Sequence, residues 1–356
     1  MTSPSNRHAH LVGLGLIGAS LAKALGERGW RVTGSDVDHG VQRNALARGV
    51  VSDATAAADT SLVVIATPAG AVAREANRVL ATIDRTDLVV TDVAGVKSSI
   101  VEQVTDPRFL AGHPMAGSEQ RGLDGARADL FRGCTWVLTP TPATLASTYS
   151  VLHGILRDIG ANVVAVSAPD HDRLVAIASH VPHLLAGALM NEAARAAEED
   201  AVLLQLAAGG FRDMTRIAGG DPTIWPDVLF ENRSAVCQAL RSLEERLGWL
   251  RRALEQDERA AIEESLYSAA VARRQLPGRA LHADRLTYLR VAVNDQPGVL
   301  AAVTVAASEL AVNIFDIEIA HGIEGVGGTL LLAVDADRAT TFLSALENRG
   351  FSVVHE

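Results

Sequence analysis

The sequence predicts an α/β protein with a doubly wound parallel sheet, followed by an all-helical domain and a small α+β domain of βαββαβ order. Three observations carry this prediction. Short apolar runs alternate with helical stretches up to Ser167, strand signals are then missing as far as Arg274, and a new alternation of strands and helices fills residues 286–356. We therefore expect domains at residues 1–167, 168–276 and 286–356, with a linker at 277–285.

The elements of the first domain follow from continuous apolar runs, which are typical of parallel strands buried on both faces. Strands are predicted at residues 10–12, 31–34, 62–66, 88–91, 136–138 and 162–166. A helix is predicted at 16–27, after the first strand. Strands that alternate with helices indicate a parallel sheet covered by helices.

The second domain is predicted from helical periodicity and the third from the return of strands. One face of the second domain carries leucines at helical spacing, namely Leu240, Leu243, Leu247, Leu250 and Leu254. The stretch 277–285 has turn residues and no clear period, which is typical of a linker. Beyond it we expect strands at 287–293, 313–320, 329–334 and 352–354, and helices at 298–310 and 338–349.

Composition narrows the possible functions. The 356 residues carry a net charge of −10, which argues against bulk binding to nucleic acid or to an anionic membrane. The sequence has no uninterrupted apolar run of ~18 residues, so we predict no membrane span. Cys134 and Cys237 form no motif, which favours a reduced, cytoplasmic protein.

A glycine motif indicates a dinucleotide site. Gly13, Gly15 and Gly18 form GxGxxG directly after the first predicted strand, and the motif includes Leu16 and Ile17 at the start of the helix. The first glycine permits a tight turn, the second lets the backbone approach a pyrophosphate, and the third lets the helix pack closely on the strand. A glycine-rich turn without a ligand is the alternative.

Residues at the ends of the next strands refine the choice of cofactor. Asp36 ends the second strand, where an acid accepts hydrogen bonds from a ribose 2′-hydroxyl and repels a 2′-phosphate. We therefore expect NAD rather than NADP. Thr67 and Pro68 follow the third strand, at the carboxyl edge where such sheets bind ligands.

Four polar segments are too particular to serve packing alone. They are GHPMAGSE at 112–119, SHVPH at 179–183, GFRDMTRIA at 210–218 and DPTIW at 221–225. Singly, each has an ordinary explanation, such as a surface histidine, a structural ion pair for Arg216 or a core position for Trp225. His180 and His183 have the spacing to share a metal, but neither an HExxH motif nor an obvious third ligand accompanies them, so no metal is expected.

Together and in this order, the segments resemble the prephenate dehydrogenase family of tyrosine biosynthesis, including its arogenate-using members. The resemblance runs from the glycine motif to about Arg274. It implies a Rossmann NAD-binding domain, a helical dimerisation domain, a cytoplasmic homodimer, and oxidative decarboxylation of prephenate to 4-hydroxyphenylpyruvate, CO₂ and NADH. An arogenate dehydrogenase that forms tyrosine directly is the alternative, because we identify no residue that reads the keto or amino group of the side chain.

The resemblance also implies residue roles. His113 is the expected proton acceptor, since imidazole titrates near neutral pH. Arg216 is the expected carboxylate clamp, because a guanidinium binds a carboxylate through two parallel hydrogen bonds. His183 completes the catalytic group and lines the substrate pocket. The remaining substrate-binding residues are His180, Trp225, Glu119 and Arg212, the last two at the rim.

One position departs from the family pattern. The family has D-x-x-S-x-K after the fourth strand, and its serine hydrogen-bonds the substrate hydroxyl and orients the histidine. This chain has Asp92-Val93-Ala94-Gly95-Val96-Lys97, so Gly95 stands where that serine is expected. Ser98, Ser99 or a water is expected to take over the contact.

Residues 286–356 resemble an ACT domain, a small amino-acid-binding regulatory module. The matching residues are Asp295, Pro297, Gly298 and Asn313. The resemblance implies that tyrosine, or else phenylalanine, binds there as an effector; the alternative is a domain that only strengthens the dimer.

Two rival functions stay open. One is another NAD dehydrogenase of β-hydroxyacid type, which would carry a lysine-based active site in the helical domain; this chain has Arg and His there. The other is a non-catalytic NAD or amino-acid sensor, against which His113, Arg216 and Trp225 together argue.

Overall fold

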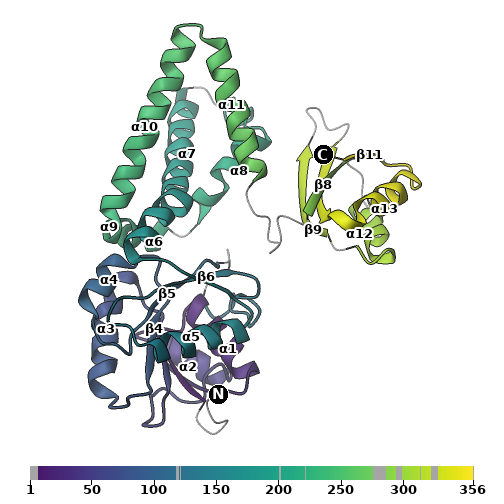
Figure 1. The fold of residues 1–356 in the computed structure, drawn as a ribbon. Coiled ribbons are helices and arrows are strands. Elements are labelled where there is room, and N and C mark those ends of the chain that lie inside the picture. Colours follow the sequence, from purple (N-terminus) through teal and green to yellow (C-terminus); the bar gives the residue numbers. More distant parts are fainter. Residues whose placement is uncertain are drawn as a thin grey trace. The chain divides into compact units, whose positions relative to one another are not determined.

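The computed structural model describes residues 7–117, 120, 122–199, 202–220, 222–275, 286–293, 299–312, 314–321 and 328–355. The chain divides into two compact units, Met1–Gly248 and Trp249–Glu356. Figure 1 labels their helices and strands.

The first unit begins with a four-stranded parallel sheet in the order β2-β1-β3-β4. Its strands are β1 (His8–Val12), β2 (Arg31–Ser35), β3 (Leu62–Ile65) and β4 (Val89–Asp92). Val12 lies opposite Ser35 in β2 and opposite Ile65 in β3, so the carboxyl ends of these strands are level. The predicted doubly wound sheet is present, and its ligand-binding edge lies just beyond these residues.

A three-stranded sheet follows, which consists of β5 (Ala111–Pro114), β6 (Thr135–Thr139) and β7 (Asn162–Ala165). β5 runs antiparallel to β6, and β6 runs parallel to β7. β5 is not predicted from the sequence, because its AGHP segment has neither an apolar run nor strong strand formers. The strands predicted at 136–138 and 162–166 were expected in the same sheet as the earlier strands, but they pair with β5 in a separate mixed sheet. The added antiparallel strand β5 carries His113.

Helices cover both faces of the parallel sheet, as Figure 1 shows. α1 (Leu16–Glu27) and α5 (Ala146–Asp158) contribute to a buried cluster that includes Leu11, Leu25 and Trp136. α3 (Ala69–Thr82) and α4 (Ser98–Gln103) contribute to a second cluster that includes Val63 and Ile65. The short α2 (His39–Ala47) follows β2 and begins at Asp38, whose carboxylate accepts from two backbone N–H groups of its first turn.

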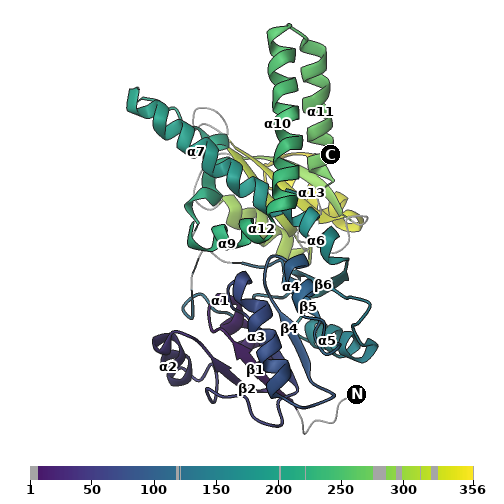
Figure 2. The ribbon, with the colours of Figure 1, turned by 90° about the vertical axis from the view of Figure 1, so that its left-hand side faces the viewer.

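Every helix or strand that the structure describes between Ser167 and Arg274 is helical, as predicted. In order, its elements are α6 (Ala168–Val175), the π-helical turn η2 (Ala176–His180), α7 (Val181–Glu199), α8 (Gly209–Thr215), the 3₁₀ turns η3 (Arg216–Gly219) and η4 (Pro222–Ile224), α9 (Trp225–Glu231), α10 (Arg233–Glu255) and α11 (Arg259–Arg274). A short turn joins α10 to α11 (Figure 2). π-helical turns often occur at functional sites, and η2 ends at His180.

Two apolar surfaces of these helices are incompletely covered. The leucine stripe of α10 includes Leu247 and Leu254, whose exposed fractions are 51% and 69%. The helical stretch Ala168–Glu198 reaches a mean hydropathy of 1.4 over 18 residues, enough by length and composition alone to cross a membrane, and 28% of that window is buried. Since this stretch also carries the buried polar residues His171, Asp172 and His180, we assign it to the helical domain.

The second unit contains the predicted βαββαβ domain. Its elements are β8 (Leu286–Val293), α12 (Val299–Glu309), β9 (Ile314–His321), β10 (Gly328–Asp335), α13 (Ala336–Glu347) and β11 (Ser352–His355). The strands form an antiparallel sheet in the order β11-β8-β10-β9, packed over a core that includes Leu289, Leu332 and Phe342. The predicted linker and the predicted effector residues Asp295, Pro297, Gly298 and Asn313 lie outside the described residues.

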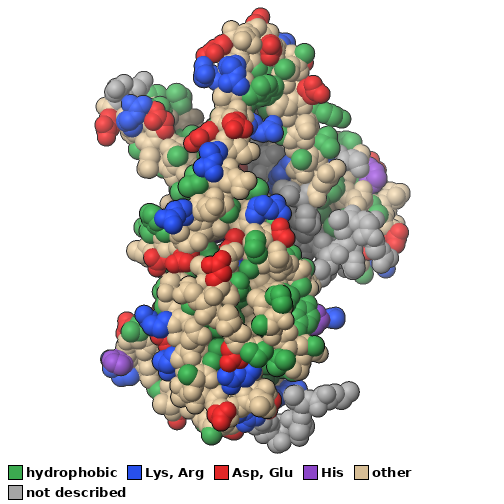
Figure 3. Space-filling view, turned by 60° about the vertical axis from the view of Figure 1, so that its left-hand side comes forward, with side chains coloured by type: hydrophobic (Ala, Val, Ile, Leu, Met, Phe, Trp, Pro, Cys, Tyr) green, Lys and Arg blue, Asp and Glu red, His purple; other side chains and the backbone are tan. Residues whose placement is uncertain are grey.

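Charged side chains are mixed on the surface. On the face shown in Figure 3, the described Lys and Arg side chains lie among Asp and Glu side chains rather than in one continuous patch. Among the described residues, this face therefore shows no extended basic surface.

Candidate active site

The glycine motif joins β1 to α1 at the carboxyl edge of the parallel sheet. Gly13 has φ +102°, and a Cβ there would lie 2.3 Å from the carbonyl oxygen of Ala66. A Cβ at Gly18 would lie 2.1 Å from the carbonyl oxygen of Gly13, so both positions exclude any side chain. A Cβ at Gly15 would meet nothing within 4 Å. The loop is therefore tightly packed at Gly13 and Gly18 but open at Gly15. The open side adjoins the N–H groups of Leu16 and Ile17 in the first turn of α1, as a pyrophosphate requires.

Asp36 directly follows β2 beside this loop. Its Oδ2 accepts from the backbone N–H of Leu14 at 2.7 Å, and its Oδ1 accepts from that of Asp38 at 2.9 Å. The half-buried carboxylate is thus held in place with further acceptor capacity on each oxygen. A ribose hydroxyl needs such an acceptor; that Asp36 binds the ribose stays a prediction.

Thr67 and Pro68 lie across the loop, between β3 and α3. Pro68 precedes the first residue of α3. The Thr67 Oγ1 is buried and has no hydrogen-bond partner among the residues that the structure describes. Because an unpaired buried hydroxyl is costly, a polar ligand atom at this edge would satisfy it. The loop geometry, Asp36 and Thr67 together fit NAD.

A buried ion pair positions β5 beside β4. The side chains of Lys97 and Asp92 are both 0% exposed and contact each other through Nζ and Oδ2. Nζ of Lys97 also donates to the carbonyl oxygen of Gly112 at 2.7 Å, and Oδ1 of Asp92 accepts from the Gly112 N–H at 3.1 Å. Burial lowers the pKa of Lys97, while the Asp92 carboxylate opposes this shift. The pair therefore fixes the backbone immediately before His113.

His113 is the first member of a chain of buried polar contacts. Its Nδ1 lies 2.9 Å from Nε2 of His171, and Nδ1 of His171 lies 2.8 Å from Oδ1 of Asp172. Burial, followed by the positive charge of Lys97, holds the pKa of His113 well below its usual range. The ring is therefore neutral at neutral pH and able to accept a proton.

The other nitrogen of His113 faces Gly95. A Cβ at Gly95 would lie 3.8 Å from Nε2 of His113 and 3.9 Å from Cγ1 of Val228, which are ordinary contact distances. Ser98 contacts Asp172 through both its backbone N–H and its side chain, and the carbonyl oxygen of Ser99 accepts from Gln103. The replacement of the family serine by either of these residues stays a prediction.

His180 and His183 approach the same region from η2 and α7. Nδ2 of Asn232 donates to the carbonyl oxygen of Asp172 at 2.8 Å and lies 3.2 Å from Nδ1 of His180. Burial lowers the pKa of His180 to about 4, so the ring is neutral. Because Nδ1 accepts from Asn232, Nε2 of His180 carries the hydrogen and is a donor.

Trp225 connects the two histidines. Its ring stacks on His183 with centroids 3.7 Å apart and an interplanar angle of 14°, and it meets His180 edge-on at 6.3 Å. A six-membered ring can lie against the outer face of such a stack, which we call the His183–Trp225 wall. The predicted grouping of His180, His183 and Trp225 is present in the structure.

The predicted cations lie on the neighbouring turns. Arg216 opens η3 and is exposed, and at the other end of this turn a Cβ at Gly220 would lie 3.9 Å from Cε1 of His183. Arg212 is exposed on α8. Glu119, the other predicted rim residue, lies outside the described residues. η3 thus borders the His183–Trp225 wall.

Two residues of this site are not predicted from the sequence. His171 and Asp172 are 1% and 5% exposed, and they link His113 to α4 and to Asn232. Their only sequence signal is the adjacent His-Asp pair in SAPDHDR, which has no motif or periodicity of its own. Among the described residues, no group of three or more His, Cys, Asp or Glu side chains could hold a metal ion.

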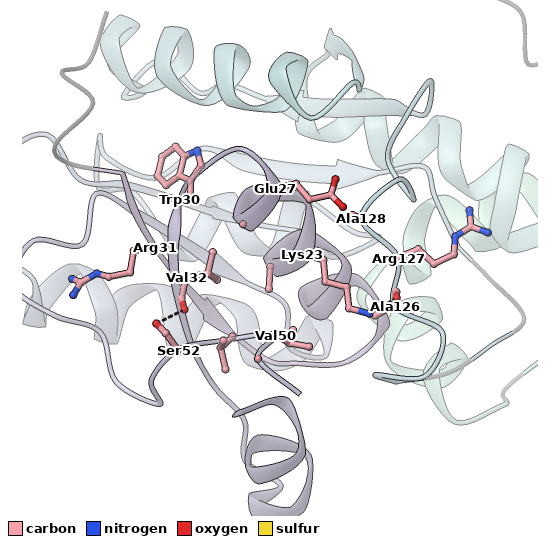
Figure 4. A pocket seen from close by; sticks show the side chains of 14 residues that line it. Lys23, Glu27, Trp30, Arg31, Val32, Val50, Ser52, Ala126, Arg127 and Ala128 are labelled. Carbon is pink, nitrogen blue, oxygen red and sulfur yellow. Dashed lines mark hydrogen bonds between the residues drawn. The ribbon is translucent and has the colours of Figure 1, made fainter. Parts of the chain in front are cut away.

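A hollow of about 630 Å³ lies elsewhere on the first unit (Figure 4). Its lining includes Lys23, Trp30, Arg31 and Arg127, and none of the predicted site residues contributes to it. Nζ of Lys23 is engaged with the carbonyl oxygen of Ala126 at 2.7 Å. The predicted site residues therefore lie apart from this hollow.

Two family models match the chain. The nucleotide-binding domain of prephenate dehydrogenase matches residues 21–165, and the prephenate dehydrogenase dimerization domain matches residues 167–268. The prephenate dehydrogenase of Bacillus subtilis is 30% identical over 340 residues, which is 92% of each chain.

Solved structures give the same assignment. The prephenate dehydrogenase from Aquifex aeolicus, crystallised with hydroxyphenyl propionate and NAD⁺, has a TM-score of 0.72 and 27% identity and covers 77% of this chain and 99% of its own. The arogenate dehydrogenase of Synechocystis has a TM-score of 0.66 and 29% identity, over 76% of this chain and 100% of its own. With matches to both domains and a 30% identical relative along nearly its whole length, this chain belongs to the prephenate dehydrogenase family.

Proposed function

We propose that this NAD-dependent oxidoreductase catalyses the oxidative decarboxylation of prephenate to 4-hydroxyphenylpyruvate. The reaction needs a base for the C4 hydroxyl proton at the same time as hydride leaves C4 and CO₂ departs from the ring. The observation that carries the proposal is His113, a neutral imidazole whose Nδ1 is held by His171 while Nε2 faces Gly95. The near full-length match to the B. subtilis prephenate dehydrogenase supports prephenate as the substrate.

NAD, when bound, supplies the hydride acceptor. The residues that would hold it are Gly13, Gly15, Leu16, Ile17 and Gly18 at the pyrophosphate, Asp36 at the ribose, and Thr67 and Pro68 across the loop. The Asp36 carboxylate favours a ribose hydroxyl and repels a 2′-phosphate, which selects NAD over NADP.

The chain's own residues do the rest. His113 takes the proton of the substrate hydroxyl at Nε2. His183 and Trp225 form the wall against which the substrate ring lies, and His180 offers a neutral N–H donor beside it. Arg216 clamps a substrate carboxylate. Arg212 and Glu119 adjust charge and access at the rim.

Arogenate is the second candidate substrate. The observation in its favour is the likeness to the Synechocystis arogenate dehydrogenase, which is as extensive as that to the A. aeolicus prephenate dehydrogenase. The two substrates differ only in a keto or amino group on the side chain. NADH formation with each substrate, and with NAD and NADP in turn, decides between them.

We further propose a cytoplasmic homodimer. The dimerization domain of the family and the partly exposed leucine stripe of α10 support self-association. Light scattering of the full chain tests it, and a monomer at micromolar concentration contradicts it.

The C-terminal βαββαβ domain is proposed to bind tyrosine, or else phenylalanine, through Asp295, Pro297, Gly298 and Asn313. The antiparallel sheet β11-β8-β10-β9 supports a separate small module. Truncation after Pro277 should leave an active dimer that ignores tyrosine. If the full chain ignores millimolar aromatic amino acids, the domain has no such effector role.

The decisive experiment for the activity is His113→Asn with prephenate and NAD. We expect kcat to fall by roughly 10²–10⁴, the usual contribution of a general base, with NAD affinity unchanged. Turnover near that of the unmodified enzyme would remove His113 from the mechanism. Absence of NADH formation by the unmodified enzyme with both prephenate and arogenate would refute the proposed activity.

A further inference from the structure

The orientation of His113 depends on two residues that do not line the substrate wall. His171 and Asp172 lie in the middle of α6, and both side chains are buried. Neither has a role in the reaction as derived so far. Their hydrogen bonds, taken in order from the carboxylate outward, decide which nitrogen of His113 carries a hydrogen.

The Asp172 carboxylate is the fixed end of this chain. Its Oδ1 accepts from the backbone N–H of Lys97 and its Oδ2 from that of Ser98, both at 2.8 Å. Burial alone would raise the pKa of Asp172, but the hydrogen bonds from His171, Ser98 and Lys97 outweigh it and lower that pKa. Asp172 is therefore an ionised acceptor.

An ionised acceptor sets the tautomer of its neighbour. Nδ1 of His171, 2.8 Å from Oδ1 of Asp172, must carry the hydrogen. In the neutral ring, Nε2 of His171 then has the lone pair. The 2.9 Å contact from Nε2 of His171 to Nδ1 of His113 consequently has its hydrogen on His113.

We infer that His171 and Asp172 are positioning residues that hold His113 as its Nδ1–H tautomer, which leaves the Nε2 lone pair on the side of Gly95 to receive the substrate proton. This inference rests on the proposed function for its kinetic consequence. When His113 accepts a proton at Nε2, its Nδ1–H still donates to His171, and the Asp172 carboxylate lies one ring further on to stabilise the new positive charge. No hydrogen leaves Nδ1 in this step.

Two substitutions at one position separate this role from simple packing. His171→Gln places an amide oxygen near the position of Nε2, so it keeps an acceptor for His113 but loses the bond to Asp172. His171→Asn places its amide near the position of Nδ1, so it keeps the bond to Asp172 but loses His113. His153→Asn, on α5, is the control; its ring stacks on Tyr149 and has no described contact with the network.

The first measurement is steady-state kinetics with prephenate and NAD. We expect His171→Asn to lose roughly 10- to 100-fold in kcat, part of the contribution of a positioned base, with KM changed less than threefold. His171→Gln should recover at least half of this loss on a logarithmic scale. A kcat for His171→Asn equal to or above that of His171→Gln would overturn the inference.

The second measurement does not need turnover. Nitrogen-15 NMR of the histidine rings distinguishes an Nδ1–H from an Nε2–H tautomer at neutral pH. We expect His113 to be Nδ1–H in the unmodified protein and in His171→Gln, and to shift towards Nε2–H in His171→Asn. An Nε2–H form of His113 in the unmodified protein would overturn the inference even if the enzyme is active. If the enzyme turns over neither substrate, the proposed function fails while the tautomer is still tested here.

Discussion

Acid should destabilise the first unit because two buried histidines of β1, His8 and His10, hydrogen-bond to side chains of β2. His8 and His10 are 1% and 5% exposed and share Thr33 Oγ1, which lies 3.0 Å from Nε2 of His8 and 2.9 Å from Nδ1 of His10. Nε2 of His10 then reaches Ser35 Oγ at 3.2 Å. The carbonyl oxygen of Ser35 accepts from the backbone N–H of Gly13, so these hydrogen bonds connect His10 to the glycine loop between β1 and α1.

The size of the effect follows from the pKa of His10. Burial, and then the charges of His8 and Arg78, lower this pKa from 6.5 to about 4. Below pH 6.5 the unfolded chain binds a proton at His10 that the folded chain binds only near pH 4, so stability falls as the pH falls through this window. At about 1.4 kcal/mol per pH unit, acidification to pH 5 should cost about 2 kcal/mol for this one residue.

Urea unfolding of His10→Gln, measured by tryptophan fluorescence at pH 7.5 and pH 5, tests this magnitude. The loss of unfolding free energy between the two pH values should be about 2 kcal/mol smaller in His10→Gln than in the unmodified protein. Buried histidines remote from His10 are the same in both proteins and cancel, whereas His8, which shares Thr33 with His10 and contributes to its low pKa, is coupled to the change. His39→Gln, which changes an exposed histidine, should leave the difference unchanged. Equal pH-dependent losses in His10→Gln and the unmodified protein would refute the reasoning.

Three further results are expected at the site. Asp36→Ser should narrow the preference for NAD over NADP in kcat/KM, and an unmodified enzyme that prefers NADP would contradict the role of Asp36. Arg216→Ala should raise KM for prephenate by roughly 10- to 100-fold, because a substrate carboxylate loses a charged partner; an unchanged KM would transfer the role to another cation. Gly95→Ser should fold normally, since a Cβ there meets only ordinary contacts, and should lower KM by giving the substrate hydroxyl a second partner; a raised KM would mean that the added hydroxyl obstructs the substrate.

The sequence predicted most of the parallel sheet because each strand there is a continuous apolar run. The runs at 62–66 and 88–91 became β3 and β4, and the glycine motif and Asp36 appear at the ends of β1 and β2 as expected. β5 could not be predicted, because it has no such apolar run. Its four residues are held by pairing with β6 and by the Lys97–Asp92 pair beneath Gly112, and neither cause is visible in the local sequence.

In the candidate site too, residues in family-like segments could be predicted from the sequence, whereas residues defined by their hydrogen-bond partners could not. His113, His180, His183 and Trp225 were predicted from family-like segments, and the structure groups them. His171 and Asp172 belong to no such segment, because their role comes from partners far along the chain: Lys97 and Ser98 at α4 and His113 on β5. A single sequence shows which side chains can do acid–base chemistry, but not which nitrogen of a ring is free to do it.

That distinction bears on how this chain can work with Gly95 in place of the family serine. A serine there would contribute one hydroxyl beside Nε2 of His113. The orientation of the ring, however, is already set from its other side by His171, whose own tautomer is set by an ionised carboxylate with two backbone donors. Loss of the serine therefore removes a contact to the substrate hydroxyl but leaves the base intact. The expected effect of Gly95→Ser is accordingly on KM rather than on kcat, whereas that of His171→Asn is on kcat rather than on KM.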